Sequence, residues 1–255
     1  MEPTLHAIRE RLLAGARRAR GIAVVIDVYR AFTSAALMAY LDAEKLTLLA
    51  EPEEVLRLKR EEGCLAVGEV DGRMVEGFDL GNSPHHILAA GRERFAGRAV
   101  AQRTSAGVTG AVAAARGAEA VVLGSYVTAA ATARYLQRLS PRPEIVTLVA
   151  MGSAGLKPSP EDEACADYLE HLLTGRPYDH ARALYEVVSH EATGKFLRGD
   201  QAHYPPADPI YCLQRDLFDF VLVAVQEEGR LVARRVDVPG ETFSNRSGPE
   251  DSFVL

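Results

Sequence analysis

Asparagine and lysine are scarce in this chain of 255 residues. Asparagine occurs only twice, as Asn82 and Asn245, and four of the 29 basic residues are lysine. Scarcity of thermolabile amides is a feature of heat-adapted proteins, although genome base composition can produce the same bias. An asparagine kept in so Asn-poor a chain is therefore a candidate for a specific task.

Cysteine is too sparse and too scattered to build a structural framework. Cys64, Cys165 and Cys212 are odd in number, lie far apart in the sequence and form no CxxC pair. The pattern therefore predicts neither a set of disulfides nor a structural zinc site. A reducing compartment fits it best, and we expect a cytoplasmic protein.

Long hydrophobic runs and an excess of positive charge are also missing. The apolar runs end at about eight residues, well short of the roughly 20 that a membrane span needs. The formal net charge of -6 gives the surface no electrostatic reason to collect nucleic acid or anionic membrane. The charged segment 1–21 lacks a signal-peptide core and predicts an amphipathic surface helix. We expect neither nucleic acid nor membrane as a partner.

Several catalytic signatures are absent as well. The sequence has no Walker GxxxxGK[ST] loop, no GxGxxG and no GxSxG elbow, and no cysteine precedes an arginine at the spacing of a cysteine phosphatase loop. The triplet at 27–29 is Asp-Val-Tyr, so it lacks the second acid of haloacid-dehalogenase-type phosphatases. Nucleotide-binding fingerprints and these standard hydrolase plans can be set aside.

What the sequence contains is an alternation of short β-branched runs with alanine-rich helical segments. This alternation is typical of βαβ units around a largely parallel sheet. The predicted strands are 22–28, 45–50, 64–70, 98–102, 120–123 and 144–151. The predicted helices are 31–41, 52–62, 84–90, 108–116, 128–139, 160–173 and 179–189, two of which begin at Ser-Pro pairs that supply a cap and a first helical proline.

The last third of the chain has a different pattern. Segment 204–209 predicts a proline-rich loop, and 218–226 with 231–238 predicts an antiparallel hairpin that either extends a sheet edge or belongs to a second lobe. The predicted fold is a three-layer α/β/α arrangement with a largely parallel sheet and a C-terminal antiparallel hairpin. It forms a single α/β domain over 1–255 or two lobes, about 1–140 and 141–255.

Polar residues suited to phosphate chemistry gather where the predicted strands end. The carboxyl ends of parallel strands share one edge of an open sheet, and ligands of such folds bind there. We therefore expect one site built from several segments. The residues concerned are Asp27, Arg30, Glu69, Arg103, Thr104, Ser105, Gly124, Ser125, Gly152 and Ser153.

The chemistry of this set favours a metal-assisted phosphate site. Asp27 and Glu69 offer the hard oxygen ligands that suit Mg²⁺, which keeps several waters while it bridges to a substrate phosphate. Backbone N–H groups and hydroxyls at 104–107 and 124–125 suit an anion. Arg30 and Arg103 could clamp phosphate oxygens in bidentate fashion.

A structural explanation exists for every member of the set. Asp27 could cap the helix after it about as readily as it binds a metal, and Glu69 could be a solvated strand end. Surface ion pairs, caps or turns would explain the others, namely Arg30, Arg103, Thr104, Ser105 and Ser125. Only their convergence on one edge favours the functional interpretation.

The segment 76–84, EGFDLGNSP, is the hardest to explain by structure alone. It could be a connecting turn. It also follows Glu69 in the chain and closes on the same edge of the sheet, and the Asn82 side chain with the helix start at Ser83 suits an oxyanion. We expect His85 and His86 to lie on the surface, and the acids at 161–163 to reflect a favourable interaction with the helix dipole.

Taken together, these segments resemble the 2-phosphosulfolactate phosphatase (ComB) family. The similarity runs from about residue 21 to 173, GFDLGNSP is its most specific part, and the C-terminal third matches poorly. The matching segments are VVIDVYRA at 24–31, GE at 68–69, GFDLGNSP at 77–84, RTSAG at 103–107, GS at 124–125 and PEDEACA at 160–166.

The resemblance implies Mg²⁺-dependent hydrolysis of the phosphate ester of a small anionic hydroxy acid, 2-phosphosulfolactate or a relative. Its product, sulfolactate, belongs to coenzyme M biosynthesis. By motif, Asp27 and Glu69 are the metal ligands, and these two with Arg30 are the catalytic residues. Arg30, Asn82, Ser83, Thr104 and Ser125 are the expected phosphate and substrate contacts, to which the residue pattern adds Arg103 and Ser105. A homodimer is compatible with the resemblance.

Two positions depart from the family pattern. Ala106 stands where many members have asparagine after a Thr-Thr pair, and Tyr29 stands where leucine is usual. Both flank the expected site, so they bear on the substrate. Attack by water and a covalent aspartyl-phosphate on Asp27 both stay open as routes. A non-catalytic anion-binding protein and a phosphotransferase on the same scaffold are the rival functions.

Overall fold

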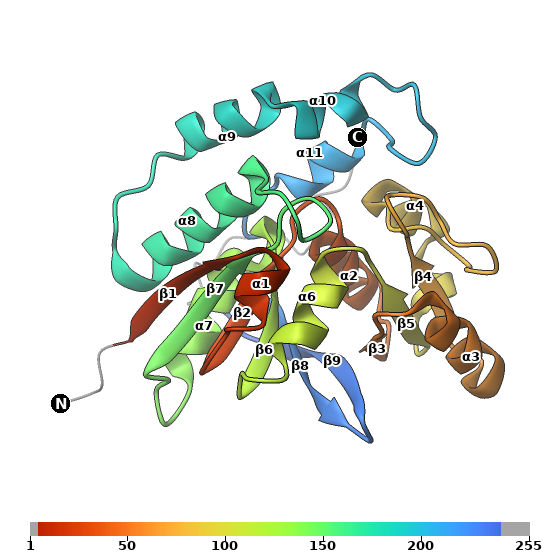
Figure 1. Cartoon of the computed structure of the whole chain (residues 1–255), viewed down its shortest axis with the longest axis horizontal. Coiled ribbons are helices and arrows are strands. Elements are labelled where there is room, and N and C mark those ends of the chain that lie inside the picture. Colours follow the sequence, from red (N-terminus) through yellow and green to blue (C-terminus); the bar gives the residue numbers. More distant parts are fainter. Residues whose placement is uncertain (1–4, 241–255) are drawn as a thin grey trace.

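The computed structural model describes residues 5–240, and one mixed sheet runs through this part of the chain (Figure 1). The strand order is β1-β7-β2-β6-β8-β9-β3-β5-β4. The nine strands of this range are β1 (His6–Arg11), β2 (Ile22–Ile26), β3 (Lys45–Leu48), β4 (Leu65–Gly68), β5 (Ala99–Arg103), β6 (Ala120–Gly124), β7 (Ile145–Ala150), β8 (Phe220–Glu227) and β9 (Arg230–Asp237).

The sheet consists of two parallel blocks joined by the C-terminal hairpin. Strands β1, β7, β2 and β6 pair in parallel, and so do β3, β5 and β4. Between the blocks, β6 pairs with β8, β8 with β9 and β9 with β3, all antiparallel. Because the direction reverses three times in succession, the block of β3, β5 and β4 (the β3 block) runs opposite to the block of β1, β7, β2 and β6 (the β2 block).

The predicted hairpin is confirmed, but its expected position was wrong. It lies in the middle of the sheet, neither at an edge nor in a second lobe. The reason is visible in the near-continuous apolar run of β8: Val221 packs into the core on one face, while Leu222 and Ala224 pack into the core on the other. A strand buried on both faces is an interior strand.

Helices cover both faces of the sheet, which confirms the predicted three-layer fold. One face carries α1 (Leu12–Ala16), α2 (Ala31–Tyr40), α4 (Pro84–Ala90), α5 (Arg92–Phe95) and α6 (Gly107–Ala114). The other face carries α7 (Ala129–Arg138) and α8 (Pro160–Thr174) over the β2 block and α3 (Pro52–Glu62) over β4 and β5. A short 3-10 helix, Tyr126–Thr128, precedes α7.

The predicted elements of the first 175 residues are confirmed to within a few residues, with one exception at the N-terminus. An amphipathic helix was expected over 1–21, but His6–Arg11 is strand β1, paired in parallel with β7, and only Leu12–Ala16 is helical. The edge of β7 offers backbone partners that a helix at this place would leave unused. Exposure alternates over the first four residues of β1, as it does in an edge strand with one face turned to solvent.

The last third adds three helices that lie across the top of the view in Figure 1: α9 (His180–Ser189), α10 (Glu191–Leu197) and α11 (Asp208–Cys212). Helix α11 occupies the end of the segment that was expected to be a proline-rich loop. It contacts α4 and α10, so these helices bridge the two blocks. None of the helices within residues 5–240 is long and apolar enough to cross a lipid bilayer.

Gly68 provides a test of how closely β4 and β5 approach each other. Its φ is +149°, and a Cβ at this position would overlap the carbonyl oxygen of Arg103, whereas Gly63, with φ +69°, has open space around it. We expect Gly68→Ala to lower the free energy of unfolding by more than about 3 kcal/mol, because strain and overlap add. Gly63→Ala should cost about 1–2 kcal/mol from its backbone conformation alone. Equal losses in urea denaturation would contradict the close approach.

Candidate active site

Asp27 lies directly after β2 and is almost fully buried. Its Oδ1 accepts a hydrogen bond from the backbone N–H of Ala31 at 3.1 Å, so it does cap the start of α2. Burial raises the pKa of Asp27 to about 7; the charges of Glu69 and Glu161 add to the rise, and backbone hydrogen bonds from Ala31 and Gly107 oppose it. The carboxylates of Glu69 and Glu161 therefore both lie within electrostatic range of Asp27.

Glu69 follows β4 and is buried too, so it is not a solvated strand end. Its Oε1 accepts the N–H of Ser105 at 2.6 Å, and its Oε2 accepts the N–H of Gly72 at 2.5 Å and the Ser105 hydroxyl at 3.2 Å. Glu69 thereby ties its own loop to the turn after β5. The position of its carboxylate is fixed by backbone donors.

Arg103, Thr104 and Ser105 form that turn after β5. The Arg103 guanidinium donates to the carbonyl oxygens of Ala50 and Glu69 and to the Ser105 hydroxyl, at 3.0, 2.5 and 3.1 Å. The Thr104 hydroxyl accepts the N–H of Val108 at 2.9 Å and so caps α6. In this arrangement Arg103 shapes the loop around Glu69, and Thr104 performs the capping role that the sequence left open.

Arg30 is held in a buried ion pair that sequence reasoning did not anticipate. Its Nη1 donates to Oδ2 of Asp208 at 2.9 Å and to the carbonyl of His203 at 2.7 Å, and its Nη2 donates to the carbonyl of Gly72 at 3.3 Å. Asp208, at the start of α11, is completely buried. Arg30 is therefore a fixed positive charge rather than a surface residue.

Asp208 also organises the segment with the most specific motif. Its Oδ1 accepts the Ser83 hydroxyl at 2.7 Å and the N–H of His85 at 3.0 Å. Ser83 in turn caps α4 by accepting the N–H of His86. The rings of His85 and His86 are exposed, as expected. Asp208 thus joins α11, the start of α4 and Arg30, the residue that directly precedes α2.

Some buried polar atoms near these segments have no hydrogen-bond partner among residues 5–240. They include Asn82 Oδ1, Ser125 Oγ and Glu161 Oε2. Ser125 directly follows Gly124, whose carbonyl accepts the N–H of Asp27 at 3.2 Å. Buried polar atoms are normally paired, so unpaired ones at the ends of strands and helices suit a bound ligand.

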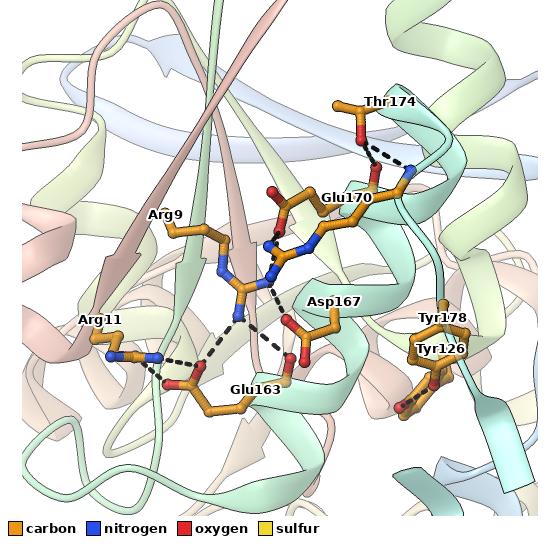
Figure 2. Close-up of polar contacts among 9 residues, drawn as sticks. Arg9, Arg11, Tyr126, Glu163, Asp167, Glu170, Thr174 and Tyr178 are labelled. Carbon is orange, nitrogen blue, oxygen red and sulfur yellow. Dashed lines mark hydrogen bonds and ion pairs between the residues drawn. The ribbon is translucent and has the colours of Figure 1, made fainter. Parts of the chain in front are cut away.

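The acids at the start of α8 do more than complement the helix dipole. Glu161 and Asp162 are buried, and burial raises the pKa of both. Asp162 accepts the N–H groups of Val28 and Gly152, each at 2.7 Å, and so joins the ends of β2 and β7. The third acid, Glu163, points away to the surface, where Figure 2 shows it between Arg9 and Arg11 of β1.

The expected residues approach one another although their strands do not share one direction. The sequence argument assumed one parallel sheet, whereas β4 and β5 run opposite to β2 and β6. Contacts between the blocks are nevertheless direct. A Cβ placed on Gly107, after β5, would lie 2.8 Å from Oδ2 of Asp27, and Arg30 reaches Gly72 of the loop after β4. The structure thus gathers these loops at the junction of the two blocks.

The donor set fits a hard divalent cation. Asp27, Glu69 and Glu161 are buried carboxylates, and a divalent cation beside Asp27 would favour its ionised form. No group of three or more His, Cys, Asp and Glu side chains in metal-binding arrangement occurs within residues 5–240. Mg²⁺ does not require one, because it is usually bound by one or two carboxylates, waters and substrate phosphates.

Sequence reasoning missed Asp208 because it lies in the third without a recognised motif. The Asp208-Pro209 pair, typical of a helix start, was the available signal. It missed the inward direction of Glu161 and Asp162 because acids in a first helical turn are ordinarily explained by the dipole. Burial, which the sequence of a helix start does not reveal, distinguishes the two cases.

Replacing Asp208 tests whether the buried ion pair is structural. We expect Asp208→Asn to lower the free energy of unfolding by about 3–5 kcal/mol, because it leaves the Arg30 charge buried and unpaired. Asp42→Asn removes the exposed pair with Arg92 and should cost less than about 1 kcal/mol. Urea denaturation of both variants measures the difference. Similar small losses would show that Arg30 does not depend on Asp208.

The chain matches one family of known proteins along most of its length. A family model described as 2-phosphosulpholactate phosphatase matches residues 8–227, further toward both ends than the recognised motifs. A probable 2-phosphosulfolactate phosphatase of Bacillus subtilis is 29% identical over 208 residues, covering 81% of this chain and 88% of the relative.

Two further relatives carry the same name. The protein of Thermus thermophilus is 39% identical over 168 residues, covering 65% of this chain and 69% of its own length. The protein of Cyanothece is 30% identical over 234 residues, covering 83% of this chain and 91% of its own length. The family model spans most of the chain, including α9 to α11 and all of β8. The chain belongs to the 2-phosphosulfolactate phosphatase family.

Proposed function

We propose that this chain hydrolyses the phosphate ester of a small anionic hydroxy acid, 2-phosphosulfolactate or a relative, to the free hydroxy acid and phosphate. The observation that carries the proposal is the cluster of buried carboxylates in which the charges of Glu69 and Glu161 both act on Asp27. Such a cluster at a junction of loops is typical of a functional site. The names of the relatives support the same reaction.

The metal would be Mg²⁺, held by the carboxylates of Asp27 and Glu69. When bound, it would neutralise phosphoryl oxygens and orient the attacking group. Burial raises the pKa of Asp27, whereas a bound cation favours the ionised carboxylate. Glu69 is already fixed by the N–H groups of Ser105 and Gly72, so its carboxylate needs little reorganisation to act as a ligand.

The remaining site residues would bind and orient the ester. The Ser125 hydroxyl, unpaired within residues 5–240, would donate to a phosphate or substrate oxygen, and the unpaired Oδ1 of Asn82 would accept from a protonated substrate oxygen or from water. Arg30, fixed by Asp208, would supply positive charge toward the developing negative charge of the phosphoryl group. The three free, buried cysteines suit a reducing cytoplasm, where we place the reaction.

Asp27→Asn tests the proposed centre most simply. The substitution keeps the side-chain volume and removes the charge, so we expect the fold to persist and kcat for a phosphate ester to fall by at least about 100-fold. Asp42 is exposed and lies just after the C-terminal end of α2, the end opposite Asp27, so Asp42→Asn should leave kcat unchanged. Full turnover by folded Asp27→Asn would contradict both the metal role and a phosphoenzyme on this residue.

Metal removal tests the cofactor independently. We expect EDTA to abolish phosphate release from phosphorylated hydroxy acids and added Mg²⁺ to restore it. A panel of such esters, with and without an acceptor alcohol, separates the rival functions. Binding without release would favour an anion-binding protein, and release only with an acceptor would favour a phosphotransferase. Incorporation of ¹⁸O and trapping of an acid-stable phosphoenzyme distinguish attack by water from attack by Asp27.

A further inference from the structure

Helix α10 carries a lysine, Lys195, to the edge of the proposed site. Two contacts with Tyr29, which directly precedes Arg30, anchor this helix. The Tyr29 hydroxyl lies 3.0 Å from Oγ1 of Thr193, and its ring meets the Phe196 ring edge-on, with centroids 5.4 Å apart. Lys195 lies between these two anchoring positions in the sequence, so its place relative to the loop after β2 is fixed.

Lys195 shares an aromatic ring with the buried arginine of the site. Its Nζ lies 4.8 Å from the centroid of the Tyr204 ring, and Cζ of Arg30 lies 5.1 Å from the same centroid. The Tyr204 hydroxyl in turn lies so close to Gly72 that a Cβ there would overlap it. Gly72 is the residue whose N–H binds Glu69. The ammonium is thus three contacts away from a proposed metal ligand, through Tyr204 and Gly72.

Arg30 and Lys195 differ in the hydrogen-bond partners of their charged groups. Arg30 donates to Asp208 and to two carbonyl oxygens. Lys195 is half-buried, yet within residues 5–240 its ammonium forms no hydrogen bond or ion pair, only the contacts with the Phe196 and Tyr204 rings. Aromatic faces hold an ammonium in place without neutralising its charge. An ammonium held in this way keeps three donors available for an anion.

The electrostatic surroundings agree with this geometry. Burial lowers the pKa of Lys195, and the charge of Arg30 lowers it further, while the carboxylates of Glu161, Asp27 and Glu69 act in the opposite direction. Lys195 therefore faces the same carboxylate cluster without being paired to any member of it. Its charge is available next to the place where the phosphoryl group would bind.

We propose that the Lys195 ammonium binds the second anionic group of the substrate, its carboxylate or sulfonate, and so selects phosphorylated acids over neutral phosphate esters. The inference rests on the proposed function, because it concerns the same site. The phosphoryl group would lie at Asp27 and Glu69, whereas Lys195 approaches from α10, outside that pair. Arg103 differs from Lys195 in that its Nε and Nη1 already donate to Ala50, Glu69 and Ser105.

The test compares Lys195→Gln with the wild type on two Mg²⁺-dependent substrates, 2-phosphosulfolactate and p-nitrophenyl phosphate, which has no second anion. Loss of a charged hydrogen bond should raise KM for the first by roughly 10- to 100-fold and change kcat little. Turnover of the second should change less than about threefold. Lys195→Arg should recover part of the lost affinity, and calorimetry with sulfolactate should show the same loss of binding without any turnover.

Two controls separate this role from general effects. Lys45→Gln removes a half-buried lysine at the start of β3, and Arg73→Gln removes an exposed cation of the loop after β4. Both should leave the selectivity unchanged, and all variants should unfold at the wild-type temperature. Equal losses on both esters, or the same loss in Arg73→Gln, would overturn the proposal. The proposal would also be overturned if the wild type did not bind sulfolactate, or if Lys195→Gln bound it as well as the wild type does. Sulfolactate binding by a wild type that releases no phosphate would contradict only the proposed hydrolysis.

Discussion

The burial of several carboxylates in one region is the constraint on which the rest of the structure depends. Each buried acid needs donors, and here the donors come from different segments: Val28 and Gly152 for Asp162, Gly72 and Ser105 for Glu69. Satisfying them fixes the loops after β2, β4, β5 and β7 relative to one another. Asp208, paired with Arg30, adds the start of α4. The same interactions that stabilise the loops therefore also define the candidate site, which is where function and stability are coupled.

The central hairpin explains why the site has contributions from strands of opposite direction. With β8 and β9 between β6 and β3, the sheet becomes two parallel blocks, and their loops meet at the junction. The helices of the last third then cover this junction (Figure 1). They supply Asp208 and Lys195, so the part of the chain with the weakest motifs provides both the partner of Arg30 and the unpaired ammonium.

Much of the fold could be predicted because strands and helices leave local signals. Periodicity and Ser-Pro helix starts located α3 and α4 at their observed bounds. The strand direction of the second block could not be predicted, because it depends on pairings between residues far apart in the sequence. For the site, strand-end polarity identified Asp27 and Glu69 as candidates, but the partner of Arg30 could not be read from spacing. Local sequence shows which groups are polar, whereas tertiary burial decides which of them are paired and which remain available.

We propose that the carboxylates of Asp27 and Glu69 share a divalent cation at the junction of the two blocks. Anomalous diffraction from crystals grown with Mn²⁺ and inorganic phosphate tests it most directly. We expect a single strong metal peak between these two side chains, with phosphate bound to it. A metal peak elsewhere in the molecule, or phosphate bound away from Asp27, would contradict it.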